Sequence, residues 1–433
     1  MTMLSSFSAY RALTPQNRRT VADMHSFRDR QIRKLVDHAY RNVPFYTRLF
    51  DSAAINPRDI RGAADLERIP VTTRDDIQNA SLADRLARGT DPAKLIARKT
   101  TGSSGQCLVV MRTWREEQTL NLFRWRALRS YGLKRKDIIG VPRIVNVIDP
   151  RDNQIPRRIA DKLRFYRKIV IDLLAPDPIG DLHAKHPEVI MSWPTVLAAM
   201  APAWAERKTS SSRAPKFIIA GGETLTEIRR ERISKGFGAR VFDMVGAHEF
   251  SLVAWECAKS GEYHLSDETM FTEVLDDGRR VEPGERGELV GTNLHSFAMP
   301  FIRYKLGDLV TQGTTPCACG SPFSSIRGIS GRVVDLIELP GGRKIHPQDV
   351  SRESFIAAPV IRTLQVVQHA LDRIELHIIP YREPTPEEIA AIYKSMEKWI
   401  GPGVSFDVVI VSEIATPPET KFRVYRSTMT DAS

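Results

Sequence analysis

The chain has 433 residues, of which 42% are hydrophobic and 27% charged, with four cysteines and a net charge of +11. This composition is typical of a soluble globular protein of two or three domains, and it excludes a disulfide framework as well as a membrane span of roughly 18 to 20 apolar residues. The N-terminus lacks a secretory signal, so we expect a cytoplasmic protein. Because the basic residues are dispersed, we expect no binding to membranes or nucleic acid, and we expect the positive charge to attract an anionic small molecule.

The first part of the chain alternates predicted helices with loops. An amphipathic helix is expected near 32–41, and the stretch 68–77 indicates a loop that leads into a helix capped by Thr72 or Thr73. A run of glycine and hydroxyl residues at 100–106 then precedes a predicted strand at 108–113 and a helix at 116–131. Such a run can direct several backbone N–H groups toward a polyphosphate, although it lacks the lysine of a P-loop. An ordinary polar turn is the alternative.

The middle of the chain contains short apolar runs separated by helical segments. The runs lie at 138–141, 144–148, 169–174, 189–191, 217–220 and 241–245. Continuous β-branched runs between helices predict buried parallel strands, and therefore an α/β fold. From Tyr263 to about Val310 the pattern becomes strand-rich, with turns at 276–278 and 282–284.

The last hundred residues differ in pattern from the rest. They predict a β-hairpin from 360–369 and 373–379, a helix at 385–400 and a strand at 405–411. This set is large enough for a small α+β domain. We therefore predict a large N-terminal multi-sheet α/β domain at 1–331 and a small C-terminal domain at 332–433.

Several motifs follow the glycine loop in a fixed order. Their central residues are Gly222-Glu223 at the end of one strand, Gly246 to Glu249 at the end of the next, Arg303 with Asp308, Gly331-Arg332, and Thr420-Lys421. Together with the segment 38–46, they resemble the acyl-adenylate-forming enzymes, and within them the phenylacetate-CoA ligase-like group, which includes CapK-like proteins. The resemblance covers essentially the whole chain.

This resemblance implies an AMP-forming acid-thiol ligase. It implies that ATP and Mg²⁺ activate a carboxylic acid, aryl or arylacetic, as an acyl adenylate, and that the acyl group passes to coenzyme A. The small C-terminal domain of such an enzyme is mobile: it presents Lys421 for adenylation and then the segment 339–343 for transfer. An amine or a carrier-protein thiol is the alternative acceptor, a degenerate nucleotide-binding relative is a further alternative, and a homodimer is a candidate assembly.

The resemblance also implies a role for each motif residue. The β- and γ-phosphates would be bound by Thr101, Gly102, Ser103, Ser104 and Gly105. The adenine site would be formed by Gly222 and Glu223, and the ribose would be bound by Asp308. Further contacts with the nucleotide would come from Gly246, Arg303 and Arg332. Glu249 would bind Mg²⁺, and Lys421 would bridge the substrate carboxylate and the α-phosphate. His248 would face the acyl substrate or act as a base toward the acceptor. In the alternative structural interpretation, Arg303 and Asp308 form a strand-end ion pair, and Glu249 is a helix-capping acid.

The chain departs from the family pattern at several positions. Gln106 stands in place of a lysine, Val245 in place of an aromatic residue that stacks on adenine, Val334 in place of an acidic residue, and Thr420 in place of a glycine. The loss of one ring stack and one charged contact weakens nucleotide binding by about a few kcal/mol.

Three cysteines and one histidine form a candidate zinc site. Cys257 and His264 flank a turn at Gly261, and Cys317 and Cys319 lie close together further along the chain. Such a set of ligands suits a closed tetrahedral zinc site of structural type, which would cross-link the strand-rich segment 257–319. Reduced cysteines beside a surface histidine are the alternative.

Overall fold

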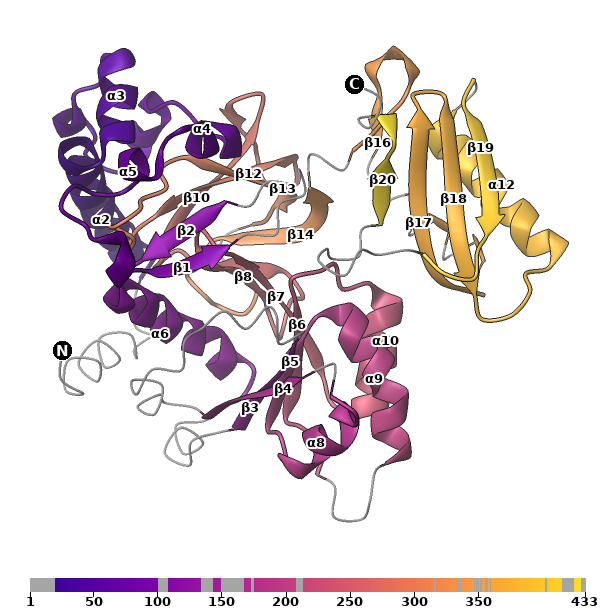
Figure 1. Ribbon diagram of the computed structural model, residues 1–433. Coiled ribbons are helices and arrows are strands. Elements are labelled where there is room, and N and C mark those ends of the chain that lie inside the picture. The colour runs from indigo at the N-terminus through magenta and orange to yellow at the C-terminus, as the bar shows by residue number, and fades with distance from the viewer. Residues whose placement is uncertain are drawn as a thin grey trace. The chain divides into compact units, whose positions relative to one another are not determined.

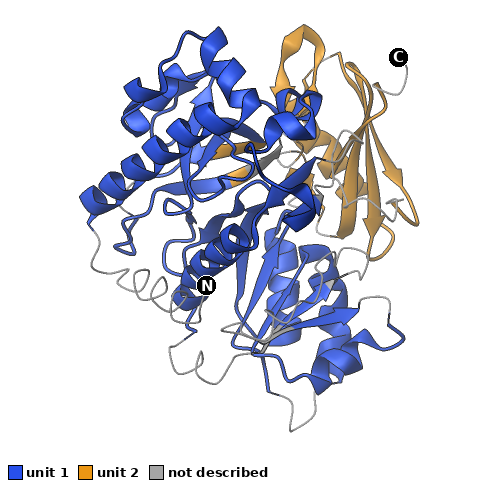
Figure 2. Cartoon of the chain, turned by 60° about the vertical axis from the view of Figure 1, so that its left-hand side comes forward, with its two compact units in different colours: residues 1–306, 311–328 blue, residues 307–310, 329–433 orange. Residues whose placement is uncertain are grey.

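The computed structural model describes the following residues: 20–99, 108–133, 143–148, 167–172, 175–207, 213–314, 317–332, 336–345, 347, 350, 353–354, 357–358, 360–401, 403–414 and 424–429. They form two compact units, one of residues 1–306 and 311–328 and the other of residues 307–310 and 329–433 (Figure 2). None of the described helices is both long enough and apolar enough to cross a membrane.

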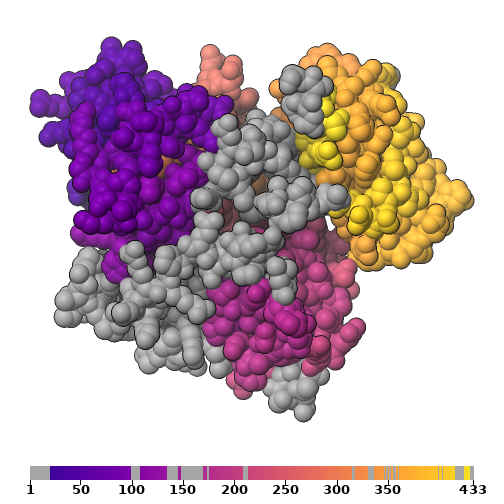
Figure 3. All heavy atoms as spheres, in the orientation of Figure 1, coloured from indigo at the N-terminus to yellow at the C-terminus, as the bar shows by residue number. Residues whose placement is uncertain are grey.

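Helices form the N-terminal part of the first unit (Figure 1), and the atoms of this part make up the indigo and purple surface in Figure 3. They are α2 (Val21–Asn42), α3 (Pro44–Ser52), α4 (Arg74–Asn79) and α5 (Leu82–Arg85), with short 3-10 segments at Pro57–Asp59, Ala63–Arg68 and Pro92–Lys94. A capping box between Thr73 and Asp76 starts α4, because each side chain binds a backbone N–H of the other residue. The predicted helix at 32–41 and the Thr73 cap are therefore confirmed.

Five parallel strands form the centre of the first unit. They are β3 (Arg143–Ile148), β4 (Arg167–Asp172), β5 (Val189–Ser192), β6 (Phe217–Gly221) and β7 (Val241–Ala247), in the order β7-β6-β5-β3-β4. This arrangement confirms the parallel α/β prediction, while the run at 138–141 lies outside the described residues.

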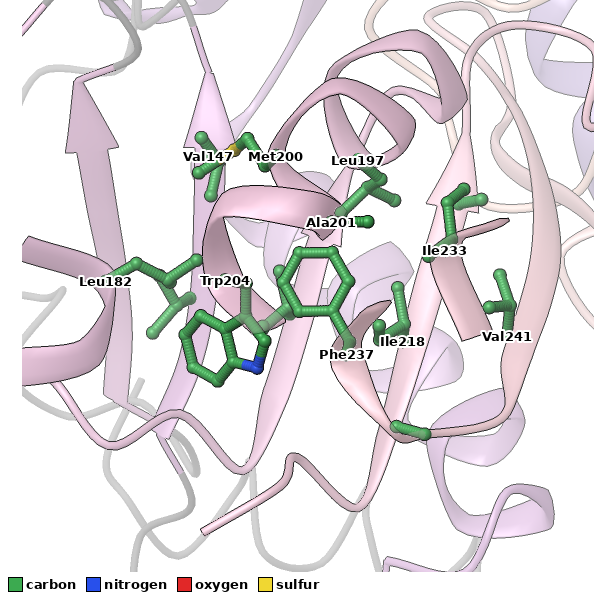
Figure 4. Close-up of a cluster of buried hydrophobic side chains, with 14 of the residues drawn as sticks. Val147, Leu182, Leu197, Met200, Ala201, Trp204, Ile218, Ile233, Phe237 and Val241 are labelled. Carbon is green, nitrogen blue, oxygen red and sulfur yellow. The ribbon is translucent and has the colours of Figure 1, made fainter. Parts of the chain in front are cut away.

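Helices cover both faces of the parallel strands. One face packs against α8 (Pro178–Ala184), α9 (Pro194–Glu206) and α10 (Glu227–Phe237), and the other against α6 (Trp114–Ser130). Trp204 of α9 and Phe237 of α10 lie side by side above the sheet, with ring centroids 5.3 Å apart (Figure 4). On the opposite face Tyr131 stacks on Phe242 at 3.9 Å. Burial from both sides explains why these strands are continuous apolar runs.

The sheet continues past β7 with antiparallel pairing. Its further strands are β8 (Ser251–Glu256), β9 (Tyr263–Leu265), β10 (Met270–Asp276), β11 (Arg279–Arg280), β12 (Arg286–Asn293), β13 (Tyr304–Gln312) and β14 (Ser325–Arg332). Asp277 and Gly278 both have positive φ, 45° and 78°, which is the backbone of the two-residue turn predicted between β10 and β11. Separately, β1 (Ile96–Lys99) and β2 (Val109–Arg112) form a two-stranded ribbon.

The second unit is built around a four-stranded sheet. It contains β17 (Ile361–Ala370), β18 (Arg373–Pro380), α12 (Pro386–Ile400), β19 (Ser405–Ile410) and β20 (Tyr425–Ser427), besides the short pair β15 (Ile337–Glu338) and β16 (Lys344–Ile345). β17 and β18 form the predicted antiparallel hairpin, and α12 connects β18 to the parallel strand β19. Ile392 and Met396 of α12 join the core of this unit with Leu376 of β18. The hairpin, helix and strand predicted here are confirmed.

A buried acid on β7 of the large sheet makes stability depend on pH. Burial raises the pKa of Asp243 to about 6, although Tyr263 donates a 2.8 Å hydrogen bond to its carboxylate and the nearby Arg230 opposes the shift. Between about pH 4 and 6 the folded protein therefore holds a proton that the unfolded chain releases. Asp243 therefore lowers the free energy of unfolding by up to about 1.4 kcal/mol for each unit by which the pH rises in this window.

We expect the stability of the Asp243→Asn variant to fall less steeply as the pH rises, because its amide keeps an acceptor for Tyr263 and does not ionise, while Asp267, whose pKa burial also raises to about 6, still contributes. Urea unfolding at several pH values between 4 and 7 measures the difference between the variant and the wild type. Parallel curves for the two proteins would contradict the assignment.

Candidate functional site

The carboxyl ends of three neighbouring parallel strands meet at one edge of the sheet. Register pairs Ser192 of β5 with Ala220 of β6, and Gly221 of β6 with Met244 of β7. Ligands of open α/β sheets bind at this edge, because the loops that follow the strands converge there. The loops after β6 and β7 carry the predicted Glu223 and Glu249.

The loop after β6 is fixed to the start of α9. Gly222 adopts a φ of 84°, a left-handed conformation that favours glycine. The half-buried carboxylate of Glu223 accepts hydrogen bonds from the hydroxyl of Thr195 and from its backbone N–H, the latter at 3.2 Å. Glu223 is thereby held at the N-terminus of α9, where the helix dipole favours a negative charge.

The turn between β7 and β8 carries Glu249. Its side chain is buried, and its carboxylate accepts a 3.2 Å hydrogen bond from the hydroxyl of Tyr304. The neighbouring His248 is exposed. Gly246 permits the close approach of the two strands, because a Cβ there would lie 2.9 Å from the carbonyl oxygen of Ser251.

The partners of Arg303 differ from those expected. Its guanidinium is buried and donates to both carboxylate oxygens of Glu273, at 3.0 and 3.1 Å. It also donates to the backbone carbonyls of Ile69 and Glu67, at 2.6 and 3.0 Å. The ion pair of Arg303 is therefore with Glu273 of β10, and its hydrogen bonds tie the N-terminal layer to the sheet.

Cys257, His264, Cys317 and Cys319 come together in space. Their ligand atoms all lie within 4.8 Å of one another. The Sγ atoms of Cys257 and Cys317 are 3.9 Å apart, and Sγ of Cys319 is 3.3 Å from Nε2 of His264. The other ring nitrogen of His264 is buried and has no hydrogen-bond partner among the described residues.

Comparison with known proteins identifies relatives over most of the chain. A phenylacetate-coenzyme A ligase of Thermus thermophilus is 26% identical over 373 residues, covering 82% of this chain and 81% of that protein. The CapK protein of Staphylococcus aureus is 23% identical over 421 residues, covering 93% of this chain and 88% of that protein. The chain is therefore similar to phenylacetate-CoA ligases and to CapK over most of its length, in agreement with the resemblance seen in the sequence motifs.

The fold is shared with a solved acyl-CoA ligase structure. A crystal structure of 2-hydroxyisobutyryl-CoA ligase in the postadenylation state superposes with a TM-score of 0.75 at 18% identity, covering 95% of this chain and 91% of that one. No protein-family model matches the chain.

Other residues that the family pattern singles out are placed less completely. Asp308 is half-buried on β13, and Val245 is half-buried on β7. Arg332 is the last residue of β14, and its side chain is not described. The positions outside the described residues are Thr101, Gly102, Ser103, Ser104, Gly105, Gln106, Val334, Thr420 and Lys421.

Three residues that support the motif residues were not predicted from the sequence. Arg112 donates to the backbone carbonyl of His248 from the end of β2, Thr195 binds Glu223, and Tyr304 binds Glu249. Only Arg112 carried a signal, because a charged residue ends an apolar strand there. The hydroxyl groups of Thr195 and Tyr304 are common in such segments and indicate nothing by themselves.

Proposed function

We propose that this protein activates a carboxylic acid with ATP and transfers the acyl group to coenzyme A in the cytoplasm. A carboxylate oxygen of the acid attacks the α-phosphorus of ATP, and pyrophosphate leaves. The sulfur of coenzyme A then attacks the acyl carbon, its proton is lost, and AMP leaves. The observation that carries the proposal is the convergence of Glu223 and Glu249 at adjacent strand ends, in a chain whose relatives include phenylacetate-CoA ligases.

Glu249 is the proposed ligand of Mg²⁺. A carboxylate oxygen is the kind of ligand that Mg²⁺ prefers, and the ion would neutralise charge on the phosphate oxygens of ATP. The surroundings of Glu249 suit this role, because its carboxylate is buried and oriented by the hydroxyl of Tyr304. The side chain is therefore held before ATP arrives, which lowers the entropic cost of binding.

The other motif residues are proposed to surround the nucleotide and the acid. Adenine would lie against Gly222, Glu223 and Gly246, with the ribose hydroxyls on Asp308. The loop of Thr101 to Gly105 would hold the phosphates, with Arg332 as a further contact, and His248 would face the acid. We assign Arg303 no contact with the nucleotide, because its guanidinium binds Glu273.

The small C-terminal domain, proposed at 332–433, would act in both steps. Lys421 would neutralise the α-phosphate and the substrate carboxylate during adenylation, and the segment 339–343 would replace it during transfer. Positioning and charge neutralisation dominate such steps, since both pass through crowded anionic states.

The test is a screen for pyrophosphate release with a panel of aryl, arylacetic and aliphatic acids. We expect release with at least one aryl or arylacetic acid, and a coenzyme A thioester in the mass spectrum. Acyl transfer to an amine or a carrier protein, with coenzyme A untouched, would instead support the alternative acceptor. ATP binding without pyrophosphate release from any acid would contradict the proposal.

We also propose that the Cys/His cluster binds a structural zinc ion. Sulfur ligands at about 2.3 Å from a tetrahedral zinc lie about 3.8 Å apart, which is close to the 3.9 Å between Cys257 and Cys317. Three thiolates and one imidazole also complete a closed coordination shell. The ion would link the turn after β8 to the loop before β14.

Loss of one ligand is expected to release the metal. The Cys319→Ser variant should contain far less than one equivalent of zinc by elemental analysis, and lose at least ~2 kcal/mol of unfolding free energy, because structural zinc contributes directly to folding. Cys107→Ser is the matched control, since Cys107 is the fourth cysteine of the chain and is not one of the proposed ligands. A wild-type protein purified without chelators and free of zinc would contradict the proposal.

A further inference from the structure

The turn that carries Glu249 has a backbone conformation that needs support. Ser251, two residues after Glu249, has a φ of 70°, which is rare for a residue with a side chain. Such a backbone conformation is strained, and it persists only where neighbouring groups hold it. The backbone N–H of Phe250 bonds the carbonyl of Ala247 at 3.1 Å, which closes the turn but does not connect it to another element.

Arg112 connects the turn to β2. Its side chain is 3% exposed, and one terminal nitrogen donates to the carbonyl oxygen of His248, the residue before Glu249. The other terminal nitrogen donates to the carboxylate of Glu117 on α6 at 3.3 Å. One buried guanidinium therefore joins α6, β2 and the turn.

Glu117 provides the charge that Arg112 requires. Its side chain is 13% exposed and lies 2.6 Å from the guanidinium of Arg98 on β1, in addition to its bond with Arg112. Burial alone would raise the pKa of Glu117, but the two arginines lower it below the usual value. The carboxylate is therefore ionised at neutral pH, and it compensates the buried charge of Arg112.

A second arginine holds the other side of the turn. Arg124, two helical turns after Glu117 on α6, donates a 3.2 Å hydrogen bond to the hydroxyl of Ser251. The turn is thus held at His248, the residue before Glu249, and at the strained Ser251, two residues after Glu249. Both contacts lead to α6, which follows β2 and so the predicted phosphate loop.

We propose that Arg112, held by Glu117, is a positioning residue that fixes Glu249 for the Mg²⁺ complex of ATP. This inference rests on the proposed role of Glu249. The guanidinium of Arg112 contacts the backbone of the turn, so Arg112 acts through Glu249. It fixes the position of the Glu249 carboxylate relative to β2, the strand that follows the predicted phosphate loop. Removing the contact leaves Glu249 present and its turn bonded to Arg124, but without the support from β2.

The test measures ATP affinity by calorimetry with and without Mg²⁺, which requires no knowledge of the acid. In Arg112→Met we expect the gain in affinity that Mg²⁺ provides to shrink by about tenfold, in the range found when a partner of a metal ligand is removed. ATP affinity without Mg²⁺ should equal that of the wild type. Glu117→Gln should shift the gain in the same direction, and Arg112→Lys, which keeps a charged donor, should recover part of it. Arg115→Met, an exposed arginine of α6, is the matched control and should behave as the wild type.

A double-mutant cycle separates positioning from a general effect on the fold. Glu249→Gln should abolish the Mg²⁺-dependent gain, and adding Arg112→Met to it should cost nothing further, because both changes remove one interaction. Additive losses, or an equal loss of affinity without Mg²⁺, would overturn the positioning role. A wild-type protein whose ATP affinity ignores Mg²⁺ would overturn the role of Glu249 as well. If Mg²⁺ raises the ATP affinity of the wild type and of Arg112→Met equally, only the positioning role of Arg112 is overturned.

Discussion

The Lys421→Ala variant is expected to bind ATP as the wild type does and to release pyrophosphate at least ~100-fold more slowly. The ammonium group is proposed to neutralise two anions, the substrate carboxylate and the α-phosphate, which otherwise repel each other as the new bond forms. This interaction strengthens in the transition state, so its loss lowers the rate more than the affinity for ATP. The measurement is pyrophosphate release with the best acid of the panel, alongside calorimetry with ATP.

Two comparisons make this result specific to adenylation. Lys394→Ala removes an exposed lysine of α12 and should release pyrophosphate at the wild-type rate. Supplied with chemically prepared acyl adenylate and coenzyme A, Lys421→Ala should form the thioester at nearly the wild-type rate, because Lys421 is proposed to serve only the first step. Equal pyrophosphate release by the wild type and Lys421→Ala would remove Lys421 from the mechanism.

Local patterns account for the parts of the fold that the sequence predicts correctly. The run at 217–220 is apolar throughout because α6 packs on one face of β6 and α9 and α10 on the other. Thr73 caps α4 through a bond that spans three residues, so its signal is contained in one short segment. The cluster of Cys257, His264, Cys317 and Cys319 could be predicted because few side chains bind zinc.

The missed contacts depend on how distant segments pair. The sequence suggests Asp308 as an ion-pair partner of Arg303, since the two are five residues apart on one segment. The partner is instead Glu273, thirty residues away on β10. Similarly, the bond from Arg112 to the carbonyl of His248 joins residues 136 positions apart, and any residue type supplies a carbonyl. A charged residue in an apolar segment thus predicts a buried partner without identifying it.

The second large effect is expected at Arg303, where the sequence and the structure suggest different roles. Arg303→Met should lower the free energy of unfolding by about 3–5 kcal/mol, the usual cost of removing one partner of a buried ion pair. Glu273 is 1% exposed and would lose both of its hydrogen bonds from Arg303, and the carbonyls of Glu67 and Ile69 would lose their donor. Urea unfolding measures the loss.

Arg280 provides the matched control for this prediction. It also contacts Glu273, at 3.3 Å, but its side chain is 46% exposed, so Arg280→Met should cost less than ~1 kcal/mol. The double variant Arg303→Met/Glu273→Leu should recover part of the loss, because it also removes the buried carboxylate that has lost its hydrogen bonds from Arg303. The folded fraction of Arg303→Met should bind ATP with the wild-type affinity. A different result, in which Arg303→Met keeps the stability of the wild type and loses ATP affinity, would place Arg303 in the nucleotide site. The ion pair between Arg303 and Glu273 would then break when ATP binds.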